Sequence, residues 1–469
     1  MEKQTNKSPA SKVSILEERI DYLEKLNQEL VEQNDKLREE NDKTSELLSF
    51  LPTDAKNQIK MKGKASSLRY KMVTVLFADV KGFTKLSETE NAEELIDELD
   101  DFFFFFDEVV KKNNIQKVKS IGDTYMCAGG IPKKNRTNPI EVIKAALEVQ
   151  DYLQSIQEKS EKSNRKIWNL TFGIHTGPVT ADVSGKRKIS YSIKGDTVNI
   201  ASRIESASNP TEISISEMTY AFMKDFFVCE YRSKIPIKYK GDTPVYTVKG
   251  LRPELSSDDA GRIPNDTFNT KFQMIQFEDI NDYIMDRLER ELPKHLYYHN
   301  LKHTIDVTIG VEILGSGEGV DDKEMILLKT AALFHDFGQI KGALNHEKRS
   351  CEIAKDILPK FDYSPEQIET IVDIIMATKL PPTPKTKLQR IICDADLDYL
   401  GRKDFIPVSD TLYRELKVQG LITDFNEWNK MQLKFLSSHQ FFTKTAQNMR
   451  LVNKEKQINR IKKIIVEED

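Results

Sequence analysis

Two aspartates in the first half of the chain are expected at strand ends, where together they could hold divalent metal ions. Asp79 follows the apolar run 73–78. Asp123 lies in the tight turn between the stretches 117–121 and 124–128. If these strands are neighbours, two bare carboxylates about 4 Å apart repel each other by roughly 4 kcal/mol at an effective dielectric near 20. Carboxylate oxygens favour Mg²⁺ or Mn²⁺, with substrate phosphates completing the shell. Taken singly, each aspartate is more typical of an ordinary turn.

An amide and a guanidinium follow in the stretch YSIKGDTVNIASRIES, residues 191–206. Residues 198–205 can begin a helix, which places Asn199 and Arg203 four residues apart on one face. An amide beside a guanidinium suits a ribose and the charge that develops on a phosphate. By itself, such a pair is more often part of a solvated helix surface.

Histidines cluster in the second half of the chain. Five of the seven histidines lie within residues 295–346. His299 and His303 are four residues apart in YHNLKHT, so both face one side of a helix. The pair His335-Asp336 ends an apolar helix, and acidic residues recur in ICDADLDYLG. Imidazole and carboxylate ligands suit Mn²⁺, Fe or Zn²⁺, and such an ion could activate water against a phosphate ester. The alternative is a set of helix-capping and surface histidines.

Strands and amphipathic helices must position the first group of residues. Apolar side chains recur at helical spacing over residues 92–112, where a phenylalanine cluster indicates core and dimer packing. Residues 139–157 predict another helix and residues 170–175 another strand. Together with the first strand and the hairpin, these elements predict an α+β fold with a ferredoxin-like βαββαβ core. After residue 268 the pattern becomes wholly helical, which predicts a second, all-α domain.

Four motifs occur in a fixed order: LFADVKGFTKLSE, VKSIGDTYMCAGG, GIHTGPV and YSIKGDTVNIASRIES. Over residues 70–250 they resemble the catalytic domain of class III nucleotidyl cyclases. The resemblance implies that Asp79 and Asp123 hold two Mg²⁺ or Mn²⁺ ions, one activating the ribose 3′-hydroxyl and one clamping the triphosphate. It also implies that Asn199 orients the ribose and that Arg203 stabilises charge on the transferring phosphoryl group.

The same resemblance implies which groups contact the substrate. Lys119 falls where the family reads the purine, and Lys240 falls on a lysine that contacts the triphosphate. Phe83 and Thr84 belong to a turn whose backbone N–H groups could face a phosphate chain. A lysine can donate to N1 of adenine but cannot accept the N1–H of guanine, and the guanine-using relatives carry glutamate there, so ATP is favoured. Ser192 stands where adenine-specific members carry Asp or Thr, and its hydroxyl could also donate to a guanine carbonyl.

In this family the core works as a dimer with the site at the interface. The resemblance implies that one chain supplies both aspartates and the other supplies Lys119, Ser192, Asn199 and Arg203. A heptad repeat that starts at Val13 has leucine at d and asparagine at two a positions. This pattern favours a parallel two-stranded coiled coil in fixed register, which would pair the chains. The alternative is a single charged helix in solvent.

The clustered histidines and acidic residues resemble the HD metal-dependent phosphohydrolases over residues 272–449. The resemblance implies a divalent transition metal, Mn, Fe or Zn, held by four side chains: His303, His335, Asp336 and Asp396. Asp394 is the alternative to Asp396 as the fourth metal ligand.

His299 matches the histidine that protonates the leaving oxygen in cyclic-nucleotide phosphodiesterases, whose YHNxxH motif reads alike. Those enzymes carry a second histidine soon after the His-Asp pair, and this chain lacks it at their spacing. His346 is a candidate replacement, as in other HD proteins, so the substrate of this domain stays open.

Composition and net charge limit the classes of protein to which this chain can belong. The chain has 469 residues, of which 39% are hydrophobic and 31% charged, and this predicts a soluble protein of two or three domains. A net charge of −4 gives no argument for nucleic acid. Four scattered cysteines favour a reducing cytoplasm over a disulfide framework or a zinc site. We find no signal peptide and no apolar run of membrane length, so we expect a cytoplasmic protein without a transmembrane segment.

The patterns divide the chain into predicted segments: disordered 1–12, coiled coil 13–50, connector 51–69, cyclase domain 70–250, linker 251–268, HD domain 269–452 and a charged helical tail 453–469. The leading hypothesis is a homodimeric adenylate cyclase that converts ATP to 3′,5′-cyclic AMP and pyrophosphate. Its HD domain would hydrolyse a phosphate ester, with the cyclic product as one candidate. The alternatives are a guanylate cyclase and a non-enzymatic signalling scaffold with degenerate sites.

Overall fold

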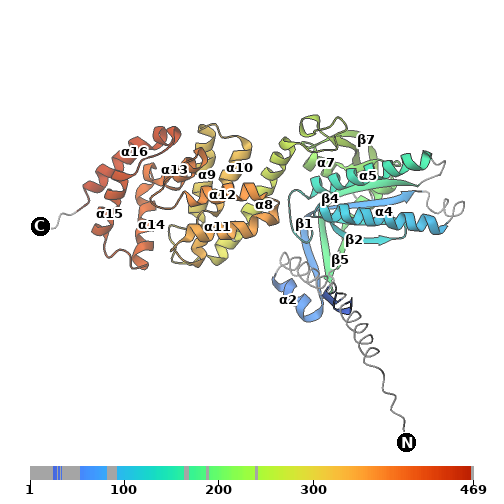
Figure 1. Cartoon of the computed structure of the whole chain (residues 1–469), viewed down its shortest axis with the longest axis horizontal. Coiled ribbons are helices and arrows are strands. Elements are labelled where there is room, and N and C mark those ends of the chain that lie inside the picture. Colours follow the sequence, from blue (N-terminus) through green and yellow to red (C-terminus); the bar gives the residue numbers. More distant parts are fainter. Residues whose placement is uncertain are drawn as a thin grey trace, which may run out of the picture. The chain divides into compact units, whose positions relative to one another are not determined.

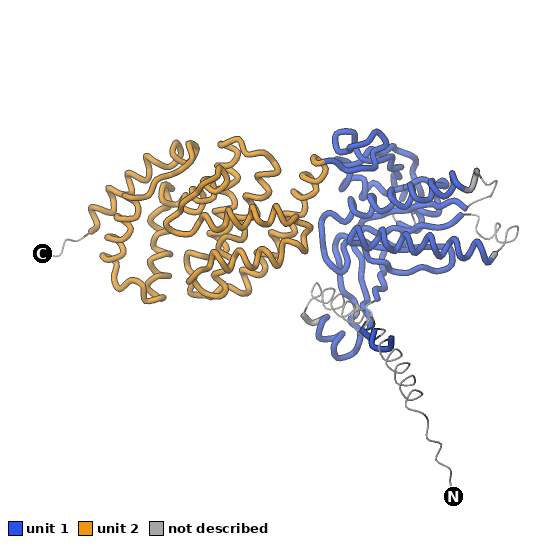
Figure 2. Tube along the Cα trace, in the orientation of Figure 1, with its two compact units in different colours: residues 1–265 blue, residues 266–469 orange. Residues whose placement is uncertain are grey.

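The chain forms two compact units, residues 1–265 and 266–469 (Figure 2). The computed structural model describes residues 25–28, 30–31, 33, 53–81, 92–162, 168–185, 190–237 and 241–465. The described residues between 25 and 33 are helical. Several predicted features lie outside the described residues: the segment 1–12, most of the coiled coil, Phe83, Thr84 and Lys240.

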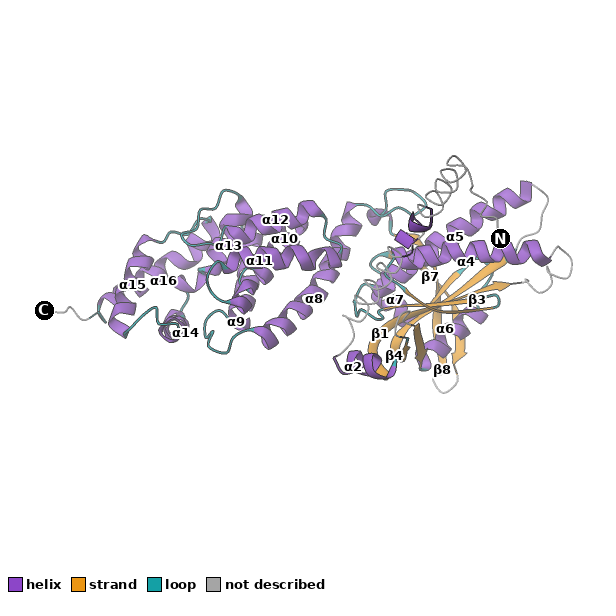
Figure 3. Ribbon diagram, turned by 60° about the horizontal axis from the view of Figure 1, so that its bottom comes forward, coloured by secondary structure: helices purple, strands orange, loops and turns teal. Residues whose placement is uncertain are grey.

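The first unit is built on one mixed β-sheet with helices on both faces (Figures 1 and 3). In chain order its elements are α2 (Thr53–Lys62), β1 (Lys64–Lys81), α4 (Ala92–Lys112), β2 (Gln116–Ile121), β3 (Thr124–Gly129), α5 (Asn138–Lys162), β4 (Asn169–Ser184), β5 (Ser190–Lys194), α6 (Asp196–Ser206), β6 (Ile213–Ser216), α7 (Glu217–Met223), β7 (Phe227–Ile237), β8 (Gly241–Leu251) and the short 3₁₀ helix η1 (Pro253–Leu255). The strands pair in the order β2-β3-β1-β4-β6-β8-β7, and β5 pairs with β4. The segment β1-α4-β2-β3-α5-β4 has the predicted order βαββαβ, and the predicted α+β fold class is confirmed.

Alternation along β1 sends its side chains into two cores. Val73, Val75 and Phe77 are buried in a cluster that also contains Ala201 of α6 and Ile59 of α2. These two helices therefore cover one face of the sheet, and α4 and α5 cover the other (Figure 3). Because β1 is antiparallel to both β3 and β4, it lies inside the sheet and is held on both sides.

Phe102, Phe103 and Phe106 of α4 pack in the core, as predicted, and the predicted dimer packing of this cluster stays a prediction. Phe102 meets Trp168 edge to face with ring centroids 4.8 Å apart, and Phe106 stacks on Tyr125 of β3 at 4.1 Å. All four rings are almost fully buried. Phe104, by contrast, points outward and is 69% exposed. Aromatic packing of this kind fixes α4 against the β2–β3 hairpin.

Helices make up every regular element in the described residues of the second unit. They are α8 (Asp266–Glu291), α9 (Leu301–Gly317), α10 (Asp322–Phe334), η2 (Phe337–Lys341), α11 (His346–Ile357), η3 (Leu358–Phe361), α12 (Pro365–Met376), α13 (Lys387–Asp396), η4 (Asp398–Gly401), α14 (Phe405–Val418), α15 (Phe425–Ser438) and α16 (Lys444–Lys462). α10 is central, with Ala331, Leu333 and Phe334 buried. Asn300 caps α9 by accepting from the amides of Lys302 and His303. The first turn of α9 is therefore rigidly placed.

The segment 252–265, within the predicted linker, packs on the first unit. Leu255 is fully buried. Arg262 donates to the carboxylate of Asp151 (2.8 Å) and to the side-chain oxygen of Gln150 (3.0 Å), both on α5. α8 then begins at Asp266.

Close contact between β4 and α6 depends on Gly173. A Cβ added at this position would overlap the backbone nitrogen of Glu205 and the carbonyl oxygen of Ala201, both in α6. The helix can approach the strand this closely only because glycine has no side chain. Since α6 also carries Asn199 and Arg203, Gly173 helps to place both predicted site residues.

We expect Gly173→Ala to destabilise the first unit by about 1–3 kcal/mol, because an overpacked site forces the backbone to move. Thermal unfolding followed by calorimetry would measure the loss. Thr180→Ala, a half-buried position on the same strand, is the control and should change the unfolding free energy by less than about 0.5 kcal/mol. An unchanged unfolding temperature for Gly173→Ala would contradict the close packing of α6 on β4.

Candidate functional site

The two aspartates predicted to bind metal lie side by side at the ends of neighbouring strands. In the β1–β3 ladder Asp79 pairs with Thr124, and the amide of Val80 donates to the carbonyl oxygen of Asp123 (3.1 Å). Gly122 makes the hairpin turn with a φ of 58°, a conformation that favours glycine. The β1–β3 register therefore brings Asp79 and Asp123 to one end of the sheet, as the sequence predicts.

A positive charge already contacts Asp79. Its Oδ1 accepts from Thr124 Oγ1 (2.7 Å) and its Oδ2 from Lys81 Nζ (2.8 Å). Lys81 Nζ also lies 3.0 Å from Oε1 of Glu205, a buried residue of α6. Burial alone would lower the pKa of Lys81, but hydrogen bonds to these two carboxylates, and their charge, raise it above its usual value. One ammonium group therefore bridges two carboxylates from different elements.

The other predicted nucleotide contacts that the structure describes are exposed. Asn199 and Arg203 lie one turn apart on α6. Lys119 is on β2 and Ser192 is on β5, and these two strands contact each other. The two residues predicted to read the base thus come from adjoining strands. None of the four side chains is buried in the core of its own unit.

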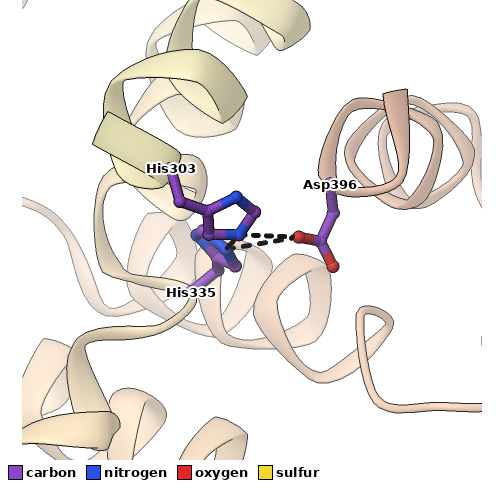
Figure 4. Close-up of side chains that lie close together, drawn as sticks. All are labelled: His303, His335 and Asp396. Carbon is purple, nitrogen blue, oxygen red and sulfur yellow. Dashed lines mark hydrogen bonds and ion pairs between the residues drawn. The ribbon is translucent and has the colours of Figure 1, made fainter. Parts of the chain in front are cut away.

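In the second unit, two histidines and two aspartates converge from the ends of helices. His303 comes from the start of α9, His335 from the end of α10, and Asp396 from the end of α13. Nε2 of His303 lies 3.1 Å from Oδ1 of Asp396 and 3.3 Å from Nε2 of His335 (Figure 4). Oδ2 of Asp336 lies 3.4 Å from both ring nitrogens. A donor set of two imidazoles and two carboxylates fits a divalent transition metal.

Hydrogen bonds and charge prepare this cluster for a cation. His335 Nδ1 donates to the carbonyl oxygen of Ala332 (2.7 Å), so its Nε2 faces the cluster. Burial alone would raise the pKa of Asp396, but His303 and His335 hold it below its usual value. Burial would lower the pKa of His303, and the neighbouring carboxylates raise it instead. The carboxylates therefore stay ionised and need positive charge beside them.

Asp394, the rival of Asp396, faces a different part of the protein. Its carboxylate accepts from the amides of Phe442 (2.9 Å) and Thr443 (2.8 Å) and from Thr443 Oγ1 (2.7 Å). The side chain is fully buried, and burial raises its pKa. Asp394 thus anchors the chain just before α16, whereas Asp396 joins the histidines.

His346 lies on the other side of Asp336. Its Nε2 is 3.1 Å from Oδ1 of Asp336 and 3.7 Å from Oε1 of Glu347. Its Nδ1 donates to the carbonyl oxygen of Ala343 (2.9 Å), which directs Nε2 toward these carboxylates. Asp336 therefore offers one oxygen to His303 and His335 and the other to His346.

Sequence reasoning missed the partner of His299. Glu415 of α14 is buried, and its Oε1 pairs with Nδ1 of His299. The other oxygen accepts from the amides of Tyr298 (2.8 Å) and His299 (3.2 Å). The His299 ring centroid lies 5.9 Å from that of His303. An oriented, partly exposed imidazole beside the cluster can move a proton to or from a bound group.

Family models match a region in each unit of the chain. Residues 65–250 match the model of the adenylate and guanylate cyclase catalytic domain, and residues 300–398 match the HD domain model. The chain carries a class III nucleotide cyclase domain and an HD domain. The first contains Asp79, Asp123 and α6, and the second contains the histidine–aspartate cluster.

Known relatives match the cyclase domain. Human guanylyl cyclase C is 33% identical over 208 residues, which cover 44% of this chain and 19% of the length of the human protein. The chain therefore spans about a fifth of the length of this curated relative. Two solved structures are similar over about two fifths of this chain. The guanylate cyclase domain of RhGC from Catenaria anguillulae, in complex with GTP, is 30% identical and fully covered, with a TM-score of 0.35. The adenylyl cyclase CyaB from P. aeruginosa is 29% identical and fully covered, with a TM-score of 0.38.

A cavity of about 270 Å³ opens beside the HD cluster. His303 and Asp396 line it together with Tyr399, Arg402 and Thr411. Arg402 is paired with Asp306 and Asp404, so its charge is balanced by that of its neighbours. Apolar walls with a few polar groups are typical of a small-molecule site.

Within the described part of the chain, no helix has the length and apolar character needed to cross a membrane.

We expect Asp394→Asn and Asp396→Asn to have different effects. Asp396→Asn should lower the metal content of the purified protein at least about tenfold, because a carboxylate of the cluster is lost. Asp394→Asn should keep the metal and lose about 1–3 kcal/mol of unfolding free energy, because one of the two oxygens that accept from buried donors becomes an NH₂ group that faces them. Metal analysis by mass spectrometry and thermal unfolding would measure both. The reverse pattern would make Asp394 the ligand.

Proposed function

We propose that this protein is an adenylate cyclase that converts ATP to 3′,5′-cyclic AMP and pyrophosphate. The observation that carries the proposal is the placement of Asp79 beside Asp123, with α6 packed on the same sheet. Divalent cations, Mg²⁺ or Mn²⁺, bound to the two aspartates would lower the pKa of the ribose 3′-hydroxyl and neutralise the phosphates. Asn199 would orient the ribose. Arg203 would stabilise the charge on the phosphoryl group as the 3′-oxygen attacks in line and pyrophosphate leaves.

We also propose that a second copy of the chain completes each site. Asn199 and Arg203 are exposed on α6, and Lys119 and Ser192 are exposed on their strands. Exposure leaves these side chains available to a nucleotide held by the aspartates of a partner. A parallel coiled coil over residues 13–50 would keep the two cyclase domains paired.

The base preference rests on Lys119. Its ammonium group can donate to N1 of adenine, and Ser192 on the adjoining strand can accept from the adenine amino group. The turn with Phe83 and Thr84 would contact the triphosphate, together with Lys240. These assignments favour ATP as the substrate.

We further place the protein in the cytoplasm, because its four cysteines are free.

A guanylate cyclase is the second candidate. The curated relatives that match the cyclase domain include the human and guinea pig guanylyl cyclase C, 33% and 32% identical over 208 residues. Ser192 could donate to the guanine carbonyl as readily as it accepts from adenine. Lys119 argues against a guanylate cyclase, because its ammonium group cannot accept a hydrogen bond from N1–H of guanine.

Product analysis would decide between the substrates. With Mn²⁺, we expect kcat/KM for ATP to exceed that for GTP by at least about tenfold, since one unmatched hydrogen bond is worth about that ratio. Asp79→Asn should lower cyclase activity by at least about a hundredfold, because a metal ligand is lost. Asp107→Asn is the control, since Asp107 pairs with Lys117 and lies on α4, which covers the face of the sheet opposite to α6. Turnover of GTP alone would support a guanylate cyclase, and turnover of neither would support the scaffold.

For the HD domain we propose a metal-dependent phosphohydrolase whose leading candidate substrate is the cyclic product. A cation held by His303, His335, Asp336 and Asp396, of the Mn, Fe or Zn type, would lower the pKa of a water near the phosphate. His299, oriented by Glu415, would protonate the leaving oxygen. The cavity beside His303 would receive the rest of the ester.

The role of His299 predicts a specific effect of Glu415→Gln. Hydrolysis of cyclic AMP should fall by about tenfold to a hundredfold, because the imidazole loses its orienting charge. Metal content and cyclase activity should stay unchanged. Glu366→Gln, an exposed position on α12, is the matched control. Both activities can be followed by chromatography of nucleotides. Unchanged hydrolysis in Glu415→Gln would contradict an acid role for His299.

A further inference from the structure

We propose that Lys81 is a built-in competitor for the metal of the cyclase site, and that it sets the cation concentration at which Asp79 is loaded. This inference rests on the proposed cyclase function, because it takes Asp79 as a metal ligand. Lys81 Nζ lies 2.8 Å from Oδ2 of Asp79 and 3.0 Å from Oε1 of Glu205. The ammonium group of Lys81 therefore occupies the side of the Asp79 carboxylate at which a metal ion would bind.

Both oxygens of Asp79 have hydrogen-bond donors. Thr124 Oγ1 donates to Oδ1 (2.7 Å) and Lys81 Nζ donates to Oδ2 (2.8 Å). Mg²⁺ binds carboxylate oxygens at about 2.0–2.1 Å and demands near-ideal geometry. A metal that takes Oδ2 therefore has to displace the ammonium group, and an ammonium group that stays close repels the metal. In either case Lys81 weakens metal binding.

Glu205 gives the displaced ammonium a second acceptor. Its Oε1 accepts from Thr171 Oγ1 (2.5 Å), and the same hydroxyl oxygen lies 3.2 Å from the backbone oxygen of Asp79. Glu205 is 5% exposed, so its charge needs a cation whether or not Asp79 holds a metal. Lys81 can release Asp79 and remain on Glu205. The acceptor is thus fixed in place, while the ammonium can move between two carboxylates.

This exchange also connects metal loading to α6. Glu205 lies two residues beyond Arg203 in the last turn of the helix. With no metal on Asp79, Lys81 ties the end of β1 to the end of α6. With a metal bound, the ammonium group would keep its contact with Glu205 on α6 and lose the one with Asp79. Lys81 is therefore a positioning residue, since it acts through Asp79 and Glu205 and not on the nucleotide.

Opposite effects of two variants test the proposal. All proteins carry Asp396→Asn, which is expected to remove metal from the HD cluster, and free Mn²⁺ is measured by electron paramagnetic resonance on the full chain. Lys81→Met removes the competitor and should lower the half-saturating Mn²⁺ concentration at least about fivefold. Glu205→Gln leaves Asp79 as the one carboxylate that contacts Lys81 and should raise that concentration at least about threefold. A purely structural ion pair would lower stability in both variants and leave Mn²⁺ affinity unchanged.

Lys117→Met and Lys81→Arg are the controls. Lys117 forms an ion pair of similar length, 2.7 Å to Asp107, and its side chain is 36% exposed against 39% for Lys81. Both controls should stay within about twofold of the parent, because each keeps a cation on Asp79. Unchanged or weaker Mn²⁺ binding in folded Lys81→Met overturns the proposal. If Lys81→Met does not fold, unchanged or tighter binding in Glu205→Gln overturns it. If Asp79→Asn binds Mn²⁺ as the parent does, the proposed metal assignment fails instead.

Discussion

Carboxylates that leave water need positive charge beside them, and both candidate sites are organised by this requirement. In the cyclase domain, Asp79 shares the ammonium of Lys81 with the buried Glu205. In the HD domain, Asp336 and Asp396 lie among histidines that hold the pKa of each carboxyl below its usual range. Both arrangements keep negative charge at a position where the proposed chemistry needs a divalent cation. The two sites differ in how the positive charge can leave the carboxylate. In the cyclase domain the ammonium group of Lys81 can move to another carboxylate, whereas in the HD domain the buried imidazoles can only exchange a proton for a metal.

The elements were predictable because their patterns are local. The run 73–78, the hairpin 117–128 and the helix 198–205 have periodicities that depend only on neighbouring residues, and all three are observed. The ferredoxin-like topology follows from their order. For the HD cluster, the prediction that His299 and His303 share one face of a helix is wrong, because α9 begins at Leu301 and His299 lies before its cap residue Asn300. The position of His335 at the end of a helix is as predicted.

The remaining features depend on contacts between distant segments. Glu415 lies 116 residues from His299 in an ordinary amphipathic helix, so no local spacing reveals it. The choice between Asp394 and Asp396 is of the same kind. Two residues apart on a helix, they point in different directions, and the pattern cannot tell which faces the histidines. In the structure the amides of residues 442 and 443 donate to the carboxylate of Asp394, whereas Asp396 faces the histidines.

Backbone contacts at two glycines place the site helices in both domains. Gly173 lets α6 lie against β4, and this brings Glu205 within reach of Lys81. At Gly338, a Cβ would overlap the carbonyl oxygen of His346, so glycine allows η2 to contact the start of α11. That contact sets His346 beside Asp336. Backbone meets backbone at these points, so neither distance can be relaxed by a change of side-chain rotamer. A single methyl group at either glycine would therefore act on a charged site through the position of a whole helix.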